Sequence, residues 1–104
     1  MVKKVLYSPG FGCGFAYGLT NGKTLAEDPT LIELVEKGEH MSGNKVSAAF
    51  RERLREIDPE EADYVADYVS TRGIENLKVT TVEGPYRIEE YDGAESILER
   101  DKAE

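Results

Sequence analysis

The sequence has few of the residues from which disulfides, metal sites and membrane spans are built. It contains a single cysteine, Cys13, a single histidine, His40, and no tryptophan. One cysteine cannot close an intramolecular disulfide, and one cysteine with one histidine does not supply the four ligands of a structural zinc site. No apolar run approaches the roughly 18 residues that a membrane-spanning helix needs. We therefore expect no metal, no cofactor and no membrane association, and a reducing cytoplasm suits the chain best.

Basic residues are also scarce relative to acidic ones. Thirteen Lys and Arg residues stand against 21 Asp and Glu residues, which gives a formal net charge of −8. A surface of this sign repels the phosphate backbone of nucleic acids unless basic residues cluster locally. Direct nucleic-acid binding is therefore not expected, whereas a basic protein partner would suit the charge.

The remaining composition is typical of one globular domain. The 104 residues are 39% hydrophobic and 33% charged, and a length near 100 residues is the commonest domain size. A chain of this length buries enough apolar surface for one core. We expect a single domain over residues 1–104, in which residues 100–104 form a frayed polar tail.

Three segments carry the signals of helices. Asp28-Pro29 begins the first, because Asp is a good N-cap and Pro is tolerated at the first helical position, and Gly38 ends it. Apolar residues at helical spacing predict a second helix over residues 46–57. Asp58-Pro59 repeats the start signal for a third helix, which is expected to end near Arg72-Gly73. The basic second helix and the acidic third helix either pair their exposed faces or present separate patches to a partner.

Alternating apolar and polar residues predict the strands. Residues 2–7 form a first strand, and residues 77–82 and 86–91 are expected to pair as an antiparallel hairpin around a Gly-Pro turn. Residues 94–98 return as a further short strand or open a last helical turn. The expected fold class is α+β, with a small antiparallel sheet covered by about three helices.

Glycine is concentrated near the N-terminus. Residues 8–23 hold five glycines, at positions 10, 12, 14, 18 and 22, interleaved with aromatic residues. A bare backbone lets N–H groups approach polar ligand atoms, and aromatic rings stack on planar groups. The spacing departs from both the P-loop and the dinucleotide-binding fingerprints. The segment is either an extended run or a loop, and its glycines are either structural or contact a ligand.

The residues that most often carry catalysis do not form a recognisable set. Cys13 would need an activating base or a positive field, and no pattern connects it with His40. His40 itself is expected to be an exposed loop residue. Glu89 and Glu90 lie on opposite faces of their strand by alternation, which weakens a paired acid and base role. No enzyme is expected, and no catalytic residue is assigned.

Two segments resemble a known group of sequences. Residues 6–15, LYSPGFGCGF, and residues 86–96, YRIEEYDGAES, are similar to a family of small phage- and prophage-encoded proteins. That family has an SPG-aromatic-G-x-G-aromatic opening and an R-I-x-E-Y-D-G-x-E close. The resemblance implies a viral accessory protein that acts in the host bacterial cytoplasm, and it brings no established activity or catalytic residues. Small phage proteins commonly counter host defence.

The leading interpretation is therefore an anti-defence protein that binds and sequesters a small nucleotide-like immune signal. A homo-oligomer is expected, because one small domain offers little concavity to enclose a ligand. The net charge disfavours a phosphorylated ligand unless Arg87, Lys23 or a helix N-terminus compensates locally. The candidate ligand-binding residues are Ser8, Gly10, Phe11, Gly12, Gly14, Phe15, Tyr17, Arg87, Tyr91, Asp92 and Glu95.

An acidic protein-interaction module is the alternative. In that interpretation the acidic third helix and the C-terminal strand contact a host defence protein or a nucleic-acid-binding protein and block it. The sequence leaves both interpretations open.

Overall fold

The computed structural model describes residues 2–9, 15, 21–72, 77–91 and 94–99. These residues form an α+β fold of four helices and three two-stranded antiparallel sheets, which confirms the expected fold class. The elements are β1 (Lys3–Tyr7), α1 (Gly22–Ala26), α2 (Pro29–Glu36), β2 (Met41–Ser42), β3 (Lys45–Val46), α3 (Ala48–Ile57), α4 (Ala62–Arg72), β4 (Lys78–Val82), β5 (Tyr86–Tyr91) and β6 (Ala94–Glu99). The expected polar tail at 100–104 lies outside the described residues.

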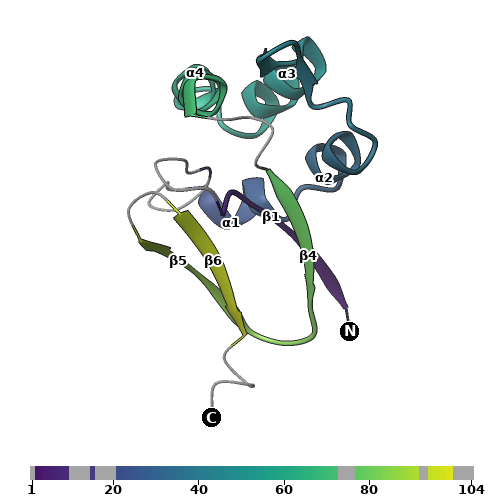
Figure 1. Ribbon diagram of the computed structural model, residues 1–104, viewed down its shortest axis with the longest axis vertical. Coiled ribbons are helices and arrows are strands. Elements are labelled where there is room, and N and C mark those ends of the chain that lie inside the picture. The colour runs from purple at the N-terminus through teal and green to yellow at the C-terminus, as the bar shows by residue number, and fades with distance from the viewer. Residues whose placement is uncertain (1, 10–14, 16–20, 73–76, 92–93, 100–104) are drawn as a thin grey trace.

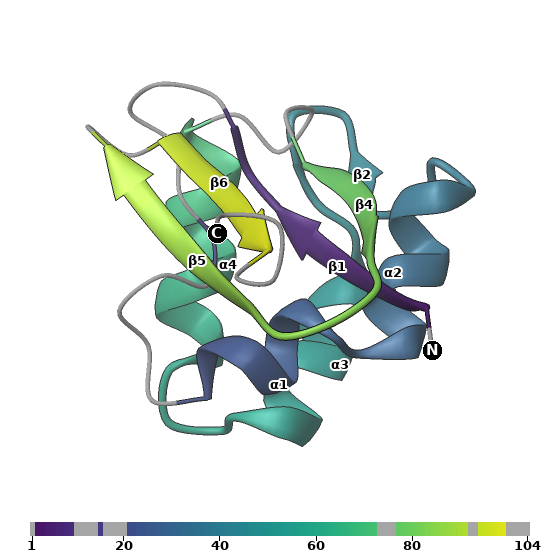
Figure 2. The same ribbon diagram turned by 90° about the horizontal axis from the view of Figure 1, so that it is seen from below.

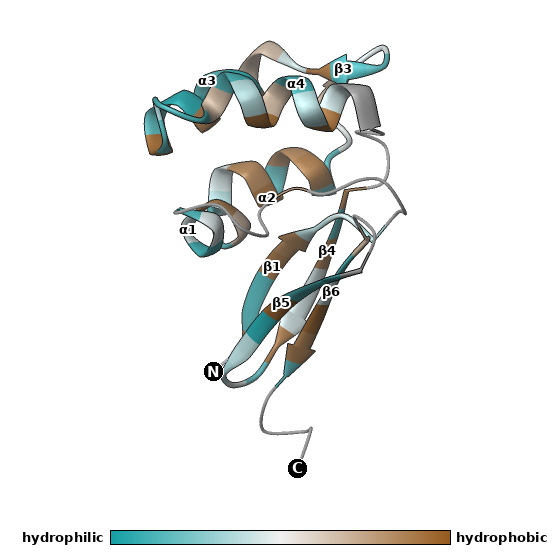
Figure 3. Ribbon diagram, turned by 90° about the vertical axis from the view of Figure 1, so that its left-hand side faces the viewer, coloured by the Kyte–Doolittle hydropathy of each residue, from teal (hydrophilic) through white to brown (hydrophobic). Residues whose placement is uncertain are grey.

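The helices lie on one side of β1, β4, β5 and β6, with α1 and α2 next to these strands and α3 and α4 further away (Figure 1). Figure 2 shows β5, β6, β1 and β4 side by side in that order, with the helices behind them. Figure 3 shows the largely apolar α2 between the strands and α3, and its Leu31 and Ile32 are buried in the core. Within the described part of the chain, none of the helices combines the length and apolar character required to cross a membrane.

The core is built from residues that the sequence patterns place on the inner faces. Phe50 of α3 is fully buried, and its ring centroid lies 6.2 Å from that of Phe15. Burying an aromatic or branched aliphatic side chain contributes about 1.5–3 kcal/mol, so this set supplies the main driving force for folding. The buried hydrophobic residues are Val5, Leu6, Phe15, Leu25, Ala26, Leu31, Ile32, Val46, Phe50, Leu54, Ala62, Val65, Ala66, Val69, Leu77, Val82 and Tyr86.

The strand pairing differs from the expected hairpin. β4 pairs with β1, from Lys3 opposite Val82 to Tyr7 opposite Lys78, and β5 pairs with β6. The hairpin expected between residues 77–82 and 86–91 is therefore wrong, and residues 94–98 are strand. Alternation specifies which face of a strand is buried but not which strand is its neighbour. Val5 and Leu6 are both fully buried, so β1 needs cover on both faces and takes an interior position.

Three short elements were not expected from the sequence. α1 follows the glycine-rich segment and buries Leu25 and Ala26. β2 and β3 form a two-rung hairpin at Gly43, whose φ of +65° favours glycine. The helix expected from residue 46 starts two residues later at Ala48, because the Ser47 hydroxyl accepts a hydrogen bond from the Phe50 N–H at 3.2 Å and caps it.

Both ends of α2 are as expected. The Leu31 N–H donates to Asp28 Oδ2 at 2.9 Å, so Asp28 is the N-cap and Pro29 follows at the first helical position. At the other end Gly38 has φ of +72°, and the N–H of Glu39 donates to the Leu34 carbonyl at 2.8 Å. This left-handed glycine with a bond back across the last turn ends the helix.

Asp28 also connects α2 to α3. Its carboxylate is buried and accepts hydrogen bonds from Arg53 Nη2 at 2.6 Å and from Arg53 Nε at 3.0 Å. Burial raises the pKa of Asp28, but the hydrogen bonds from Arg53 and Leu31 and the guanidinium charge outweigh it and lower the pKa below the ordinary value of 3.8. The folded state therefore favours the ionised carboxylate.

We expect Asp28→Asn to lower the melting temperature at pH 7 by roughly 5–10 °C, because Asn still caps the helix but loses the charge-assisted bonds to Arg53. The pKa of Asp28 is lower in the folded state, so the contribution of its charge is present above about pH 4 and is lost as the pH falls through the folded pKa. Thermal unfolding by circular dichroism from pH 7 to pH 2 should show a steeper loss for the wild type than for the variant.

Glu33→Gln is the matched control, since it also removes one carboxylate from α2, but one that is exposed and pairs only with Lys37 at 3.5 Å. Its melting temperature should stay within about 2 °C of the wild type. If the melting temperatures of Asp28→Asn and the wild type fall in parallel as the pH is lowered, the Asp28–Arg53 pair is not the source of the acid sensitivity.

Candidate functional site

The candidate site lies where β1 ends beside β6. Glu95 is the second residue of β6 and stands opposite Glu90 of β5 in the antiparallel register. Alternation along β6 turns its side chain toward the core, and only 2% of Glu95 is exposed. Ser8, the first residue after β1, is equally buried at 2%. A carboxylate and backbone N–H groups are therefore enclosed together, so the carboxylate needs donors and the N–H groups need acceptors.

Glu95 binds both ends of the glycine-rich segment. The Ser8 N–H donates to Glu95 Oε1 at 2.8 Å, and the Phe15 N–H donates to Glu95 Oε2 at 3.1 Å. The Glu95 N–H in turn donates to the Ser8 carbonyl at 2.8 Å. Hydrogen bonds to an ionised acceptor are about twice as strong as neutral ones. We refer to Ser8, Phe15 and Glu95 with these three bonds as the Glu95 clamp.

The structure brings together three of the residues predicted to bind a ligand, namely those of the Glu95 clamp. Phe15 contributes its backbone there, while its ring is 5% exposed and packs on Phe50 in the core. The backbone of Tyr91 is the last rung of β5, paired with Ala94. Six other predicted residues lie outside the described part of the chain: Gly10, Phe11, Gly12, Gly14, Tyr17 and Asp92.

Arg87 is not brought to the Glu95 clamp. It stands opposite Leu98, whereas Glu95 stands opposite Glu90, so the two pairs are three residues apart along β5. Three residues of strand span about 10 Å, and an odd separation places Arg87 on the other face of the hairpin from Glu95. The Arg87 guanidinium is exposed and pairs with Glu89 at 2.7 Å.

Lys23 also lies elsewhere, in a cluster that the sequence patterns did not predict. Its ammonium donates to the Tyr86 carbonyl at 3.1 Å and lies 4.5 Å from the centroid of the Tyr86 ring. The Tyr86 hydroxyl donates to Glu27 Oε2, and burial together with this carboxylate raises the pKa of Tyr86. Lys3 pairs with the other oxygen of Glu27 at 3.3 Å. This cluster fixes α1 against the start of β5.

His40 is buried, with 7% exposed, so the expectation of an exposed loop residue is wrong. The Ser47 N–H donates to the His40 carbonyl at 2.9 Å, which folds the β2–β3 hairpin back over this position. The hairpin signal was weak, because two rungs are too short to show alternation. Cys13 lies outside the described residues. Across the ranges that the structure describes, no group of three or more His, Cys, Asp or Glu is placed to hold a metal ion.

A pocket at the start of α4 was also missed by sequence reasoning. It is lined by Asn21, Asp58, Pro59, Glu60 and Glu61. The Asp-Pro-Glu-Glu run predicts only a helix start; in the structure Asp58 is the C-cap of α3 and accepts from the Glu61 N–H at 3.2 Å, in the turn before α4 begins at Ala62. The signal that could have revealed a site is the density of carboxylates beside that cap.

Comparison of the chain with protein-family models, with curated proteins and with solved structures found no match.

We expect Glu95→Gln to speed hydrogen exchange at the Ser8 and Phe15 amides by about tenfold or more, because a side-chain amide keeps one acceptor oxygen and loses the charge. Exchange followed by NMR at neutral pH measures both amides separately. Glu89→Gln removes an exposed carboxylate from the same hairpin and should leave both rates unchanged. Equal exchange rates in the wild type and Glu95→Gln would contradict the Glu95 clamp.

Proposed function

We propose that this protein binds and sequesters a small nucleotide-like signal, as a phage accessory protein that counters a bacterial defence from within the cytoplasm. The observation that carries the proposal is the Glu95 clamp. It binds the backbone of Ser8 and of Phe15, which flank the glycine-rich residues 10–14 in the sequence, to Glu95 of β6. Ser8 and Glu95 come from the two stretches singled out in the sequence and, although 87 residues apart, are hydrogen-bonded to each other.

Recognition in this proposal uses the main chain and aromatic rings. The Ser8 and Phe15 N–H groups are already bound to Glu95, so the N–H groups of residues 10–14 supply the donors to the ligand. The Phe15 ring is in the core, so stacking on a base falls to Phe11 and Tyr17. Base stacking of this kind contributes about 1–3 kcal/mol per base.

Charge sets the kind of contact that the ligand makes. Lys23 is held at Tyr86 and Arg87 pairs with Glu89 on the far face of the hairpin, so neither basic residue lies at the Glu95 clamp. Any phosphate of the ligand is then bound by backbone N–H groups, which bind anions without a basic side chain. A second copy of the chain would enclose the exposed side of the ligand.

The interaction module has less support. Its acidic surface comprises α4 and the C-terminal strand, and on α4 Arg51 pairs with Asp63 at 3.3 Å and with Asp67 at 3.0 Å. Arg55 pairs with Asp63 at 2.9 Å, so the exposed faces of α3 and α4 are paired with each other. Much of the charge that a basic partner would recognise is already compensated within the chain.

Release of an intact nucleotide after denaturation tests the proposal. The purified protein is incubated with a panel of cyclic dinucleotides and ADP-ribose-type signals, desalted and denatured, and the supernatant is analysed by chromatography and mass spectrometry. We expect one class to be retained and recovered chemically unchanged. Glu95→Ala should reduce the retained amount by about tenfold or more, and Glu89→Gln should not. Retention of no panel member contradicts sequestration, and recovery of a converted product would show an enzyme.

Arg87→Ala tests whether a neighbouring copy contributes its Arg87 to the site. Because Arg87 lies on the other face of the hairpin from Glu95, the variant should bind the retained nucleotide within about twofold of the wild type. Isothermal titration calorimetry measures the affinity. A loss of about tenfold or more would contradict recognition without a basic side chain and place Arg87 of a neighbouring copy at the ligand.

A further inference from the structure

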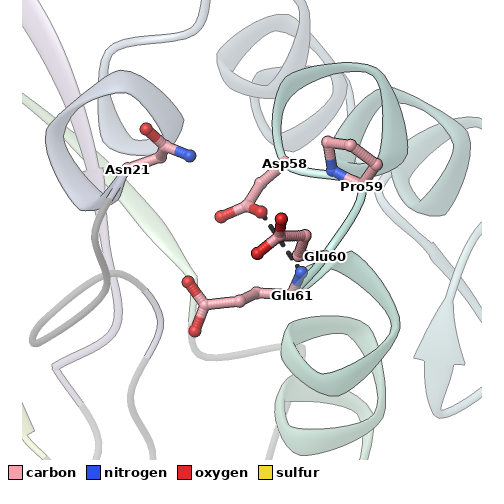
Figure 4. Close-up of a pocket in the computed structure, with 5 residues that line it drawn as sticks. All are labelled: Asn21, Asp58, Pro59, Glu60 and Glu61. Atoms are coloured by element: carbon pink, nitrogen blue, oxygen red, sulfur yellow. Dashed lines mark hydrogen bonds between the residues drawn. The ribbon is translucent and has the colours of Figure 1, made fainter.

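The pocket at the corner between α3 and α4 contains a buried carboxylate oxygen without a hydrogen-bond donor. Only 5% of Asp58 is exposed, and its Oδ1 accepts from the Glu61 N–H. Its Oδ2 is buried and has no hydrogen-bond partner. Figure 4 shows the Asp58 side chain pointing into the space between Asn21 and the two glutamates. Leaving a buried charged acceptor unsatisfied is costly, so this atom indicates a missing donor.

The charge around the pocket points to a cation. Asp58, Glu60 and Glu61 line it together with Asn21 and Pro59, and none of these lining residues is basic. The arginines of the neighbouring α3 are engaged elsewhere, with Asp28, Glu56, Asp63 and Asp67 as their partners. Three carboxylates around one recess repel each other and attract a positive group.

The geometry distinguishes between kinds of cation. A guanidinium favours two parallel bonds to both oxygens of one carboxylate, whereas only Oδ2 of Asp58 is without a hydrogen-bond partner. An ammonium donates its three N–H bonds separately, so it can reach Asp58 Oδ2 and a glutamate at once. The pocket has a volume of about 230 Å³, far above the roughly 10–15 Å³ that one water needs. Pro59 provides an apolar wall for an alkyl chain.

We propose that the pocket lined by Asn21, Asp58, Pro59, Glu60 and Glu61 binds the primary ammonium group of a small alkylamine, with Asp58 Oδ2 as its buried acceptor. Glu60 lines the pocket and is exposed, so its carboxylate contacts the bound ammonium from the solvent side. The pocket shares no described residue with the Glu95 clamp, so the inference stands apart from the proposed function.

NMR titration with 1,4-diaminobutane tests the inference. We expect chemical-shift changes confined to the amides of Asn21, Asp58, Glu60 and Glu61, which saturate as for a single binding site. Tetraethylammonium carries the same charge per nitrogen but no N–H donor, and should give no saturable shifts there. Tetraethylammonium binding equal to that of the diamine, or diamine shifts spread over the whole acidic surface, would overturn the proposal. Saturable Mg²⁺ binding at the same amides in preference to the diamine would also overturn it.

Asp58→Asn keeps the shape of the side chain and an oxygen to cap Glu61, and should weaken diamine binding by about tenfold. Glu83→Gln removes the same charge from the β4–β5 connection, outside the pocket, and should leave the affinity within about twofold. If Asp58→Asn does not fold, Glu60→Gln makes the same test from an exposed position and should weaken binding by about threefold. Unchanged affinity in the folded Asp58 or Glu60 variant contradicts the proposed site.

Discussion

A carboxylate buried in a protein interior is stable only when hydrogen-bond donors surround it, and Glu95 obtains two of its donors from the backbone near the N-terminus. Those donors, the N–H groups of Ser8 and Phe15, belong to residues on either side of the glycine-rich segment. Because Glu95 is buried in β6, the backbone at Ser8 and at Phe15 must lie beside it to donate these hydrogen bonds. The same contact joins the β1–β4 pair to the β5–β6 pair, because Glu95 also donates its own N–H to Ser8.

The need of a buried carboxylate for hydrogen-bond donors also positions the helices relative to one another. Asp28 is buried between α2 and α3, and Arg53 satisfies it with two hydrogen bonds. Asp63 and Asp67 on α4 are exposed and take their partners from α3, which contributes less to stability but aligns the two helices. Asp58 differs from these residues, because it is as buried as Asp28 and uses only one of its two oxygens. That difference is why the α3–α4 corner, and not α4 as a whole, suggests a ligand.

Local signals in the sequence predicted three of the four described helices. The Asp28-Pro29 start and the Gly38 end of α2 act over one turn of chain, so they depend little on the rest of the fold. Strand partners are set by contacts between distant residues, and the β1–β4 and β5–β6 pairs were therefore not recoverable from alternation. The two segments of the candidate site could be singled out from glycine, aromatic and turn residues. Their connection through Glu95 could not, because a glutamate in an acidic strand usually faces solvent.

Compensation of charge within the chain determines what each candidate site can bind. The protein has a net charge of −8, and the basic residues of α3 are bound to carboxylates of α2, α3 and α4. An anionic ligand at the Glu95 clamp must therefore be recognised by the main chain, which is the role for which a run of glycines is suited. At the α3–α4 corner the excess of carboxylates has the opposite effect, because an incoming ammonium supplies both the donor that Asp58 Oδ2 lacks and the positive charge that the pocket lacks.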